Sequence, residues 1–548
     1  MSARAGAAVV IVTTLMTCGL VGASCATAAR FAVGIAPHES STAVAERLSA
    51  RGATRIVDLR PIRALTFSAP DADALRGIPG AIYVERLRSR RPSYVPNDPF
   101  LARQWYATQN RAFDTWLDPP PLASVRVAVI DSGVDGGHPE FRGRIAASKS
   151  FVGGSAMVDT QGHGTFVAGL IAAETNDGLG IAGLAPPAEL LIAKVVGPQR
   201  SIPIEAEAKA IRWAVAKGAR VINMSLGGPR DPLKPSRDTY SKLEADAVAY
   251  AVSKGVLVVA AVGNSDQSPA QPWPYASWPA ALPHVVGVSA IGREGRSPGF
   301  SNRDAQFNDI AAPGEDILST FPRQLTSVFP DCGEQGYSSC GPQEFRAAEG
   351  TSFAAPQVTA AAAVLLATSP GLKPDQVTAL LVRSAVDAVP ANGCGQCSPG
   401  RDRYTGFGRL DQAAALELLA TGLPPADRYE PNDGGGTSAY TLYGARRRVE
   451  ATLDYWNDRD DVYRVYVHAG ERLVVTADAG AFVRPALALW LPGTLTVDAK
   501  PAAVRRLAAR GAGIALGYRA RTSGWYLLAV RSTKSVSGRY RLTVSRSP

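Results

Sequence analysis

Charged residues are scarce in this sequence: they make up 19% of its 548 residues, against 46% hydrophobic residues. This balance excludes a wholly disordered chain and a heptad-repeat fibre. The 53 glycines follow no Gly-X-Y period, which excludes a collagen. At about 100–200 residues per domain, the length predicts two to four folded units and ample material for a large buried core.

The charge is unevenly distributed along the chain. The formal net charge is +10, but residues 94–423 contain 27 Lys and Arg against 31 Asp and Glu, whereas residues 424–548 contain 19 against 11. The basic excess therefore belongs to the two ends. Neither end carries a known nucleic-acid-binding motif, so we expect no nucleic acid partner and interpret the arginine run 446–448 as a solvated face.

The amino-terminal residues have the layout of a secretory signal peptide. Residues 5–29 carry no charge, Arg4 precedes them, and Ala26-Thr27-Ala28 is a small-residue cleavage signature. We therefore expect residues 1–28 to be removed and the protein to be secreted. An uncleaved membrane anchor is one alternative, because the length permits it, and Cys25 leaves a lipoprotein as another. We expect no other uncharged run to be long enough to span a membrane, and hence no membrane span after signal cleavage.

Cysteine is rare: six residues, of which two lie in the predicted signal peptide. The remaining four allow three pairings. In an oxidising compartment we expect local disulfides, Cys332 with Cys340 and Cys394 with Cys397. The Cys-x-x-Cys spacing of the second pair also fits a redox pair or half a zinc site, but no second such pair and no nearby histidine accompany it.

Short apolar, β-branched runs alternate with helix-like stretches through the centre of the chain. Such runs predict buried strands, and their alternation with helices predicts an α/β domain with a parallel sheet covered on both faces. Functional residues should lie at the carboxyl ends of these strands. The predicted strands are 125–130, 190–196, 220–224, 256–262 and 285–290, and the predicted helices include 204–217 and 240–254.

Three central residues have side chains suited to nucleophilic catalysis. Asp131 follows a predicted strand, His163 opens a helical stretch in Gly-His-Gly-Thr, and Ser352 opens a long apolar helix in Gly-Thr-Ser. Taken singly, the aspartate fits a turn and the serine fits a helix cap. Together they supply a nucleophile, a base that accepts its proton, and a carboxylate that holds the base in one tautomer.

The order Asp, His, Ser and five motifs resemble the subtilases, the subtilisin-like serine proteases, over residues 94–420. The motifs are VAVIDSGVDGGHPEF, GHGTFVAG, INMSLGG, AAVGN and GTSFAAPQV. The resemblance implies that Asp131, His163 and Ser352 are orienting acid, base and nucleophile. It also implies that the Asn264 side chain and the Ser352 backbone N–H bind the oxyanion. Without the matching motif, Asn264 would fit an ordinary Gly-Asn turn.

The same resemblance implies a polypeptide substrate. In the family, an extended substrate pairs with a strand through main-chain hydrogen bonds, which have little sequence preference. The segment 277–280 resembles the rim of the primary specificity pocket, and the preferred side chain stays open. The residues that match the substrate-pairing strand are Ser225, Leu226, Gly227 and Gly228.

A calcium site is also implied by the resemblance. Calcium binds six to eight carboxylate and carbonyl oxygens, and three separate segments match its ligands in the family: 94–100, 138–140 and 174–181. The alternative is that Asn-Asp-Gly at 176–178 is only a turn. The implied ligands are the side chains of Asp98, Glu140 and Asp177 and the backbone carbonyls of Glu174, Leu179 and Ile181.

The flanking regions resemble two known modules. Residues 29–93 have a β-α-β-β-α-β order, with helices at 41–50 and 71–76, like the inhibitory propeptide of subtilases; a retained small domain is the alternative. Residues 424–548 predict an all-β sandwich with strands at 461–468, 472–477, 525–530 and 539–544. They resemble the bacterial pre-peptidase C-terminal domain through Glu-Pro-Asn-Asp at 430–433 and Asp-Val-Tyr at 461–463.

These features predict a secreted, calcium-stabilised serine endopeptidase that activates itself by cutting off its own propeptide. The expected order is signal peptide 1–28, propeptide 29–93, α/β catalytic domain 94–423 and β-sandwich 424–548. We expect a monomer whose partners are polypeptide substrates and its own propeptide. The alternatives are an inactive subtilase scaffold and a surface adhesin that acts through the carboxyl-terminal domain.

Overall fold

The computed structural model describes residues 29–69, 78–87, 94–115, 122–197, 199–325, 344–423, 427–430, 432, 434, 439–454, 460–479, 485–494, 497, 505–508, 513–532 and 537–548. The chain divides into two compact units, Met1–Arg91 and Pro92–Pro548. The predicted signal peptide and the cysteines Cys332 and Cys340 lie outside the described residues.

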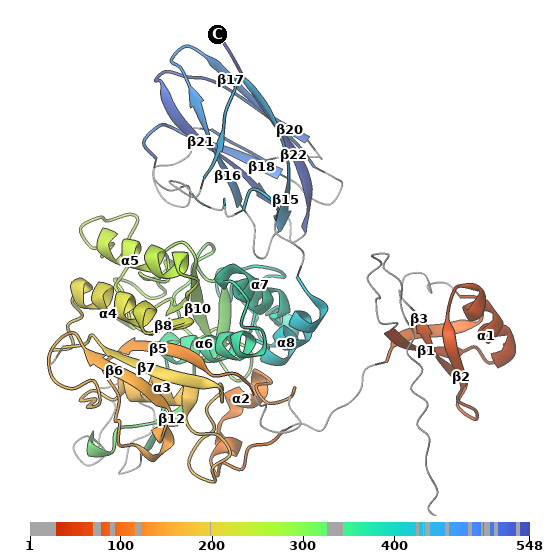
Figure 1. Ribbon diagram of the computed structural model, residues 1–548, viewed down its shortest axis with the longest axis horizontal. Helices are drawn as coiled ribbons and strands as arrows, with labels where there is room; N and C mark the ends of the chain where they lie inside the picture. Colours follow the sequence, from red (N-terminus) through yellow and green to blue (C-terminus); the bar gives the residue numbers. More distant parts are fainter. Residues whose placement is uncertain are drawn as a thin grey trace, which may run out of the picture. The chain divides into compact units, whose positions relative to one another are not determined.

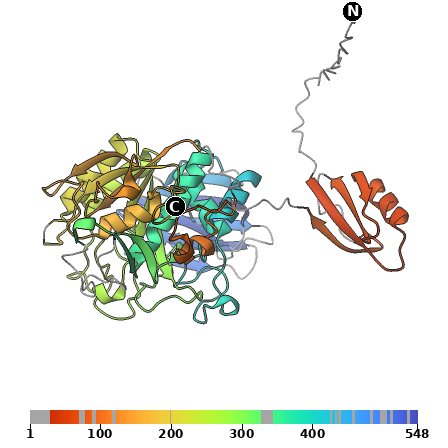
Figure 2. The same cartoon turned by 90° about the horizontal axis from the view of Figure 1, so that it is seen from below.

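The amino-terminal unit contains a four-stranded antiparallel sheet in the order β2-β3-β1-β4, with α1 on one face (Figure 2). Val44 and Leu48 lie one turn apart on α1 and are buried in one apolar cluster with Phe31 and Phe67 of the sheet. The predicted second helix, 71–76, lies outside the described residues. The elements are β1 (Ala29–Ile35), α1 (Ser41–Ala50), β2 (Thr54–Asp58), β3 (Ala64–Ala69) and β4 (Ala81–Arg86).

A seven-stranded parallel sheet forms the centre of the second unit, in the order β11-β10-β9-β8-β5-β7-β6 (Figure 1). Strands β8, β9 and β10 are buried along their whole length, as expected for a parallel sheet with both faces covered. The strands are β5 (Val125–Asp131), β6 (Ile145–Ser150), β7 (Ala188–Lys194), β8 (Val221–Met224), β9 (Leu257–Ala261), β10 (Val285–Ile291) and β11 (Ile310–Pro313).

Two apolar clusters lie on opposite faces of this sheet. Alternate residues of β5 enter different clusters: Val127 and Val129 pack with helices α3 and α6, whereas Ala128 and Ile130 pack with α4 and α5. This explains why the strand is a continuous apolar run. The helices are α2 (Trp105–Gln109), α3 (His163–Ala172), α4 (Ile204–Ala216), α5 (Lys242–Ser253), α6 (Thr351–Thr368), α7 (Pro374–Ser384) and α8 (Gln412–Thr421), and a hairpin is formed by β12 (Ile317–Thr320) and β13 (Phe345–Ala348).

Helix α6 corrects one expectation from the sequence. Residues 350–372 carry no charge, and α6 is the one helix among the described residues that is long and apolar enough to cross a membrane. The expectation that no run beyond the signal peptide had this length was therefore wrong. Inside the domain, 89% of the helix is buried. Only Ser352 and Thr368, near its two ends, are not fully buried.

Cys394 and Cys397 are joined by a disulfide within the second unit. Both sulfur-bearing side chains are buried and lie in a small apolar cluster with Ile291 and Ala311. The bond therefore closes a local loop beside the edge of the parallel sheet, where β10 pairs with β11.

The carboxyl-terminal region consists of two sheets, in the orders β14-β16-β21-β18-β19 and β15-β22-β17-β20. Alternate residues of their strands, such as Val465 of β16 and Val475 of β17, share one apolar cluster, which confirms the expected all-β fold. All pairs are antiparallel except β14 with β16. The strands are β14 (Tyr440–Leu442), β15 (Arg446–Asp454), β16 (Asp460–Val467), β17 (Arg472–Ala479), β18 (Pro485–Trp490), β19 (Arg505–Ala508), β20 (Gly513–Arg519), β21 (Gly524–Ser532) and β22 (Ser537–Ser547).

Candidate active site

Asp131 is the last residue of β5, which lies between β8 and β7 in the sheet. Its side chain is 2% exposed. The backbone N–H of Ser132 donates to Asp131 Oδ1 at 2.7 Å. A carboxylate at the carboxyl end of a central parallel strand is where the fold class places functional groups.

His163 is the first residue of α3. The preceding Gly162 makes the turn into the helix with a φ of 88°, a conformation that glycine adopts without steric cost. The Nδ1 atom of His163 lies 2.9 and 3.0 Å from the two carboxylate oxygens of Asp131. Burial lowers the pKa of His163, but the charges of Asp131 and Asp159 raise it, and the net pKa lies above its usual value.

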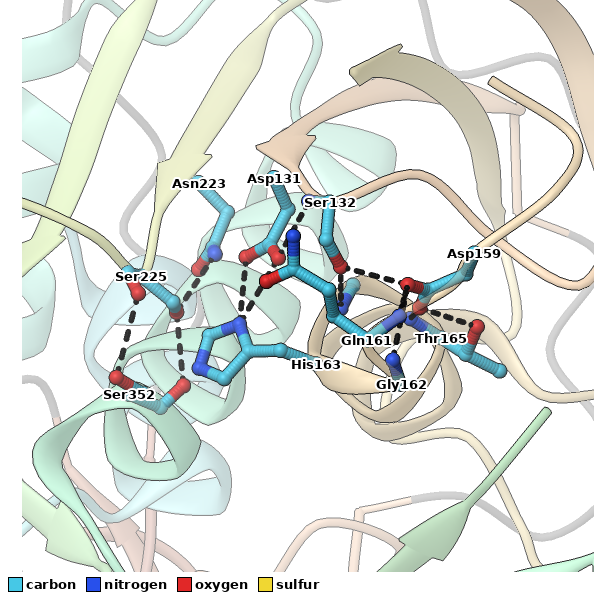
Figure 3. A network of polar contacts seen from close by, with 11 residues as sticks. Asp131, Ser132, Asp159, Gln161, Gly162, His163, Thr165, Asn223, Ser225 and Ser352 are labelled. Carbon is cyan, nitrogen blue, oxygen red and sulfur yellow. Dashed lines mark hydrogen bonds and ion pairs between the residues drawn. The ribbon is translucent and has the colours of Figure 1, made fainter. Parts of the chain in front are cut away.

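A second buried carboxylate, Asp159, holds the start of α3 in place (Figure 3). Its Oδ1 accepts from the Ser132 hydroxyl at 2.9 Å and from the backbone N–H groups of Gln161 and Gly162 at 3.0 and 2.9 Å. Its Oδ2 accepts from the backbone N–H and hydroxyl of Thr165 at 2.9 and 2.7 Å. Asp159 therefore fixes the residues on both sides of His163. Asp159 was not predicted from the sequence, although an acidic residue just before a helix start is a capping signal.

Ser352 is the second residue of α6, which begins after Gly350. The Ser352 hydroxyl donates to the backbone carbonyl of Ser225 at 3.2 Å, and the Ser225 hydroxyl donates to the carbonyl of Ser352 at 2.7 Å. The side-chain amide of Asn223 donates to the Ser225 hydroxyl at 2.9 Å. Two reciprocal contacts thus join the start of α6 to the end of β8.

The imidazole of His163 lies between Asp131 and Ser352, with its second nitrogen on the side of Ser352 (Figure 3). The ring of Phe353 packs against it, with centroids 5.5 Å apart. Because Phe353 is 5% exposed, the imidazole has a fixed apolar wall on one side. The three predicted residues therefore come together from β5, α3 and α6, which are far apart in the sequence.

Asn264 follows β9 and lies beside the start of α6. Its Oδ1 accepts from both the backbone N–H and the hydroxyl of Thr351, each at 3.0 Å. A β-carbon placed on Gly350 would lie 3.3 Å from Asn264 Nδ2, so the amide nitrogen sits directly next to this glycine. Because Thr351 holds Oδ1, the side-chain amide of Asn264 has a fixed orientation. Its Nδ2 donor lies beside Gly350, two residues before Ser352.

The predicted substrate-pairing segment continues from β8. Ser225 is buried, whereas Leu226, Gly227 and Gly228 are partly or fully exposed. Gly228 pairs with Trp278 through two backbone hydrogen bonds of 3.0 and 2.9 Å. A β-carbon on Gly227 would lie 1.9 Å from the Trp278 carbonyl oxygen, so only glycine permits this approach.

The predicted calcium ligands Asp98 and Glu140 are both buried carboxylates. Asp98 Oδ2 accepts from the N–H of Asn176 at 2.8 Å and Glu140 Oε1 from the N–H of Ile181 at 3.0 Å, but Asp98 Oδ1 and Glu140 Oε2 are buried without a hydrogen bond. Burial raises the pKa of both groups, that of Glu140 to about 8, and the nearby negative charge of Asp177 adds to the effect.

The other implied calcium ligands lie in the same loop. The Leu179 N–H donates to Asp177 Oδ1 at 2.8 Å, and the Glu174 N–H donates to the Glu140 carbonyl at 2.9 Å. Within the part of the chain that the structure describes, no group of three or more His, Cys, Asp or Glu side chains is arranged to hold a metal ion. A cation here would therefore depend on backbone carbonyls as well as carboxylates.

Comparison with known proteins gives consistent matches to the central domain. Residues 123–408 match the subtilase family. Thermitase of Thermoactinomyces vulgaris is 32% identical over 231 residues, which are 42% of this chain and 77% of that protein. The major intracellular serine protease of Bacillus subtilis is 37% identical over 222 residues, and the thermophilic serine proteinase of Bacillus sp. strain AK1 is 33% identical over 249 residues.

The matched regions cover 39% and 45% of this chain for the two Bacillus proteins. They span 65% and 58% of the length of those proteins, so about a third of the first and about two fifths of the second lie outside the match. The residues matched by the family include Asp131, His163 and Ser352.

Proposed function

Because the chain belongs to the subtilase family of serine proteases, we propose that it is a serine endopeptidase with Asp131, His163 and Ser352 as its catalytic triad. The observation that carries this proposal is the 2.9 Å contact between the Asp131 carboxylate and His163 Nδ1. The second ring nitrogen of His163 lies on the side of Ser352, at the start of α6. A nucleophilic serine needs a base that is itself oriented, and Asp131 orients His163 on the side of Ser352.

The chemistry follows from the positions of these groups. His163 Nε2 accepts the proton of the Ser352 hydroxyl as Oγ bonds to the peptide carbonyl carbon, and Asp131 stabilises the imidazolium that forms. The carbonyl oxygen becomes an oxyanion that accepts hydrogen bonds from the Ser352 N–H and Asn264 Nδ2. The imidazolium then gives its proton to the leaving amine, the peptide C–N bond breaks, and water releases the acyl group from Ser352 by the same steps.

Polypeptides are the proposed substrates because Leu226 and Gly227, which follow β8, are partly or fully exposed and carry backbone groups with which an extended chain can pair. An extended peptide adds to such a segment through main-chain hydrogen bonds and can continue on both sides of the cut. This arrangement favours internal cleavage over removal of single terminal residues.

Calcium is the proposed structural cofactor. Asp98 and Glu140 fit it, since each has a buried carboxylate oxygen without a hydrogen bond, and calcium prefers carboxylate and carbonyl oxygens. Asp177 and the carbonyls of Glu174, Leu179 and Ile181 would complete the set. The ion would supply positive charge that joins the segment around Asp98 to the 174–181 loop, and it would take no part in the reaction.

Secretion and self-activation complete the proposal. Residues 1–28 have a signal-peptide layout, and the sheet-and-helix unit that follows is the proposed inhibitory propeptide. Cleavage of a covalently attached segment is effectively unimolecular, so it should be fast and independent of concentration. The mature monomer would keep the catalytic domain and the β-sandwich.

A comparison of the full-length chain with its Ser352→Ala variant, both from a protease-free host, tests this proposal. The wild type should begin near Tyr94, cut casein internally and be labelled by a fluorophosphonate at Ser352. The variant should accumulate as a folded precursor that begins near Ala29. If the wild type is neither labelled nor active while folded, the inactive-scaffold alternative replaces the proposal. If the variant is trimmed as fast as the wild type, Ser352 is not the nucleophile of that step.

A further inference from the structure

The two sheets of the β-sandwich (blue in Figure 1) have different outer faces. On the sheet β14-β16-β21-β18-β19, Val462, Trp490 and Leu527 belong to a second apolar cluster on the side away from the core. On the sheet β15-β22-β17-β20, no described residue that points away from the core belongs to an apolar cluster. The proposed protease chemistry does not use this second face, which is open to another role.

Alternation along the strands identifies the residues of this open face. On β17, Leu473, Val475 and Ala477 lie in the core, so the residues on either side of each of them point outward. The same alternation holds on the other three strands. Six arginines and two acidic residues are among the outward residues, which are Arg446, Arg448, Glu450 and Thr452 of β15, Arg539, Arg541, Thr543, Ser545 and Ser547 of β22, Arg472, Val474, Thr476 and Asp478 of β17, and Gly513, Ala515, Gly517 and Arg519 of β20.

The two acidic residues lie at one end of this face, on either side of Arg541. The register places Glu450 and Asp478 opposite Arg541 on the two neighbouring strands. Glu450 Oε1 accepts from Arg541 at 3.3 Å and from Arg448 at 3.2 Å. The other end of the face contains arginines and no acidic residue. We call it the basic end, and it consists of Arg446, Ser545, Val474 and Gly517 in one cross-strand row and Ser547, Arg472 and Arg519 in the next.

Two positive charges of the basic end lie directly opposite each other. Arg472 of β17 and Arg519 of β20 are cross-strand partners, and both are exposed. Among the described residues, neither forms an ion pair. Like charges in directly opposed positions of an antiparallel pair are destabilising, because their β-carbons lie only about 4.5–5.5 Å apart. A surface that only had to be solvated would not need this pair, whereas an anion bound between the two guanidinium groups would remove the repulsion.

The floor of the basic end is open between its arginines. A β-carbon placed on Gly517 would meet no atom within 4 Å. The Ser545 hydroxyl donates to the carbonyl of Val474 at 3.4 Å, so this side chain lies low on the sheet. Neighbouring strands are about 4.8 Å apart. Arg446 on β15 and Arg519 on β20 are therefore separated by three strand spacings, roughly 14 Å, with only small side chains between them.

The residue types on this face select the kind of anion that fits it. None of the outward residues is aromatic, whereas single-stranded nucleic acid is held by stacking of its bases on aromatic rings. A flat sheet face also presents no helix or ribbon that enters the groove of a duplex. Binding to a lipid surface requires large apolar side chains beside the cations, and Val474 and Ala515 are the only apolar residues with a side chain here. Arginines among hydroxyl groups instead suit a sugar polymer with carboxylates, which guanidinium binds through two parallel hydrogen bonds.

We propose that the basic end of this face binds a linear polysaccharide that carries carboxylate groups. The Arg472–Arg519 pair would hold one carboxylate and Arg446 another, and the sugar chain would cross the floor between them over Gly517 and Ser545. The sandwich would then keep the protein on an acidic polymer. The proposal does not depend on the proposed catalytic triad, because no residue of the triad takes part in this binding.

Binding of alginate, a carboxylated polysaccharide, to the full chain tests the proposal, with Ser352→Ala as the parent so that self-cleavage does not interfere. The parent should bind alginate and not the neutral polysaccharide pullulan, and its affinity should fall as salt rises because exposed charges are screened. The double variant Arg472→Gln/Arg519→Gln should bind alginate about tenfold more weakly or less.

Two variants with the same change in net charge report the location. Gly517→Glu adds a negative charge where space is available, so it should weaken binding. Arg212→Gln removes one exposed arginine from α4 of the catalytic domain, so it should bind alginate as tightly as the parent. If both variants weaken binding equally, net charge and not the basic end accounts for it, and the proposal is overturned.

Thermal unfolding of the same proteins separates lost binding from lost folding. Without polysaccharide, Arg472→Gln/Arg519→Gln should unfold at the same temperature as the parent or slightly above it, because the repulsion between the two arginines is gone. Equal affinity of the parent and the folded double variant for alginate would overturn the proposal, as would equal affinity of the parent for pullulan. Tighter binding of duplex DNA or of anionic lipid vesicles than of alginate, at the same salt concentration, would assign the face to another partner and overturn it as well.

Discussion

Buried carboxylates in two regions of this molecule are treated in opposite ways. At the candidate active site, both oxygens of Asp131 and both of Asp159 accept hydrogen bonds from the protein. At the proposed calcium site, one oxygen of Asp98 and one of Glu140 are buried without a donor. In the first region, hydrogen-bond donors of the protein stabilise the negative charge. In the second region, the proposed calcium ion would do so.

The difference matters because satisfied and unsatisfied carboxylates respond to different perturbations. A fully hydrogen-bonded carboxylate orients its neighbours whatever the solution contains, so changes there should affect catalysis. An unsatisfied one becomes favourable only with a cation, so changes there should affect stability in a calcium-dependent way. The following tests would contradict this division if a variant at the candidate active site mainly changed stability, or if calcium removal mainly changed catalysis.

Ser352→Ala should have the largest effect. We expect kcat to fall about a millionfold, the size of the same change in the related subtilisin. Stability should fall by only about 1 kcal/mol, because the hydroxyl makes one hydrogen bond, to Ser225. Because the variant should keep its amino-terminal unit, both proteins are first trimmed by an added protease, which is then removed; steady-state kinetics and thermal unfolding then measure the two quantities. A large loss of stability would show that Ser352 also has a structural role. That result would contradict the separation between residues that affect catalysis and residues that affect stability.

Asn264→Ala should lower kcat about 10²–10³-fold with little change in KM, because its Nδ2 would act mainly on the oxyanion of the transition state. Steady-state kinetics with a peptide substrate check this. Asn264→Asp is a matched variant that keeps the acceptor for Thr351 but replaces the amide donor. An active Asn264→Asp enzyme would argue against the oxyanion role and in favour of a purely structural contact with Thr351.

Asp159→Asn tests the positioning of His163. Its charge raises the pKa of His163, and only the neutral imidazole accepts the serine proton. Removing the charge should lower that pKa and move the acid limb of the kcat/KM profile to lower pH. Misplacement of the imidazole should reduce the plateau by up to about a hundredfold.

Ser132→Ala is the control for Asp159→Asn, since it removes one hydrogen bond to Asp159 and no charge. Its plateau activity should fall, but its acid limb should stay in place. If both variants shift the pH profile equally, geometry and not charge accounts for the effect of Asp159.

Removal of calcium should have the smallest effect on catalysis and act on stability instead. A ligand that binds only the native state stabilises it by about 2.7 kcal/mol at a hundredfold excess over its Kd, which is roughly 5–10 °C in Tm for a domain of this size. Chelator should lower the Tm of the wild type and of Asp159→Asn alike. It should have a reduced effect on Glu140→Gln. An identical Tm with and without chelator in the wild type would contradict calcium binding.

Much of the central domain could be predicted from the sequence because its signals are local. The β-branched run that forms β9 was placed at 256–262 and spans Leu257–Ala261. The helix predicted at 204–217 is α4, Ile204–Ala216. A strand buried on both faces is a continuous apolar run, and such a run needs no knowledge of its neighbours.

The β-sandwich was predicted less completely. Strands β15, β18 and β20 were not singled out, because one face of each is exposed or only partly buried and alternation over a few residues is a weak signal. The buried hydrogen bonds of Asp461 were not predicted for another reason. Its sequence context, Asp-Val-Tyr, shows a strand, but whether its oxygens find donors depends on Tyr540 and Asn432, residues far away in the chain.

Helix α6 has a consequence for how the enzyme would lose activity. The proposed nucleophile lies on the first turn of a helix that is 89% buried, so it cannot move without the helix. In amide hydrogen exchange, the N–H groups of the helix interior should be among the slowest in the chain and exchange only through global unfolding. On heating, catalytic activity should therefore disappear together with the folded core, and not in an earlier, separate transition.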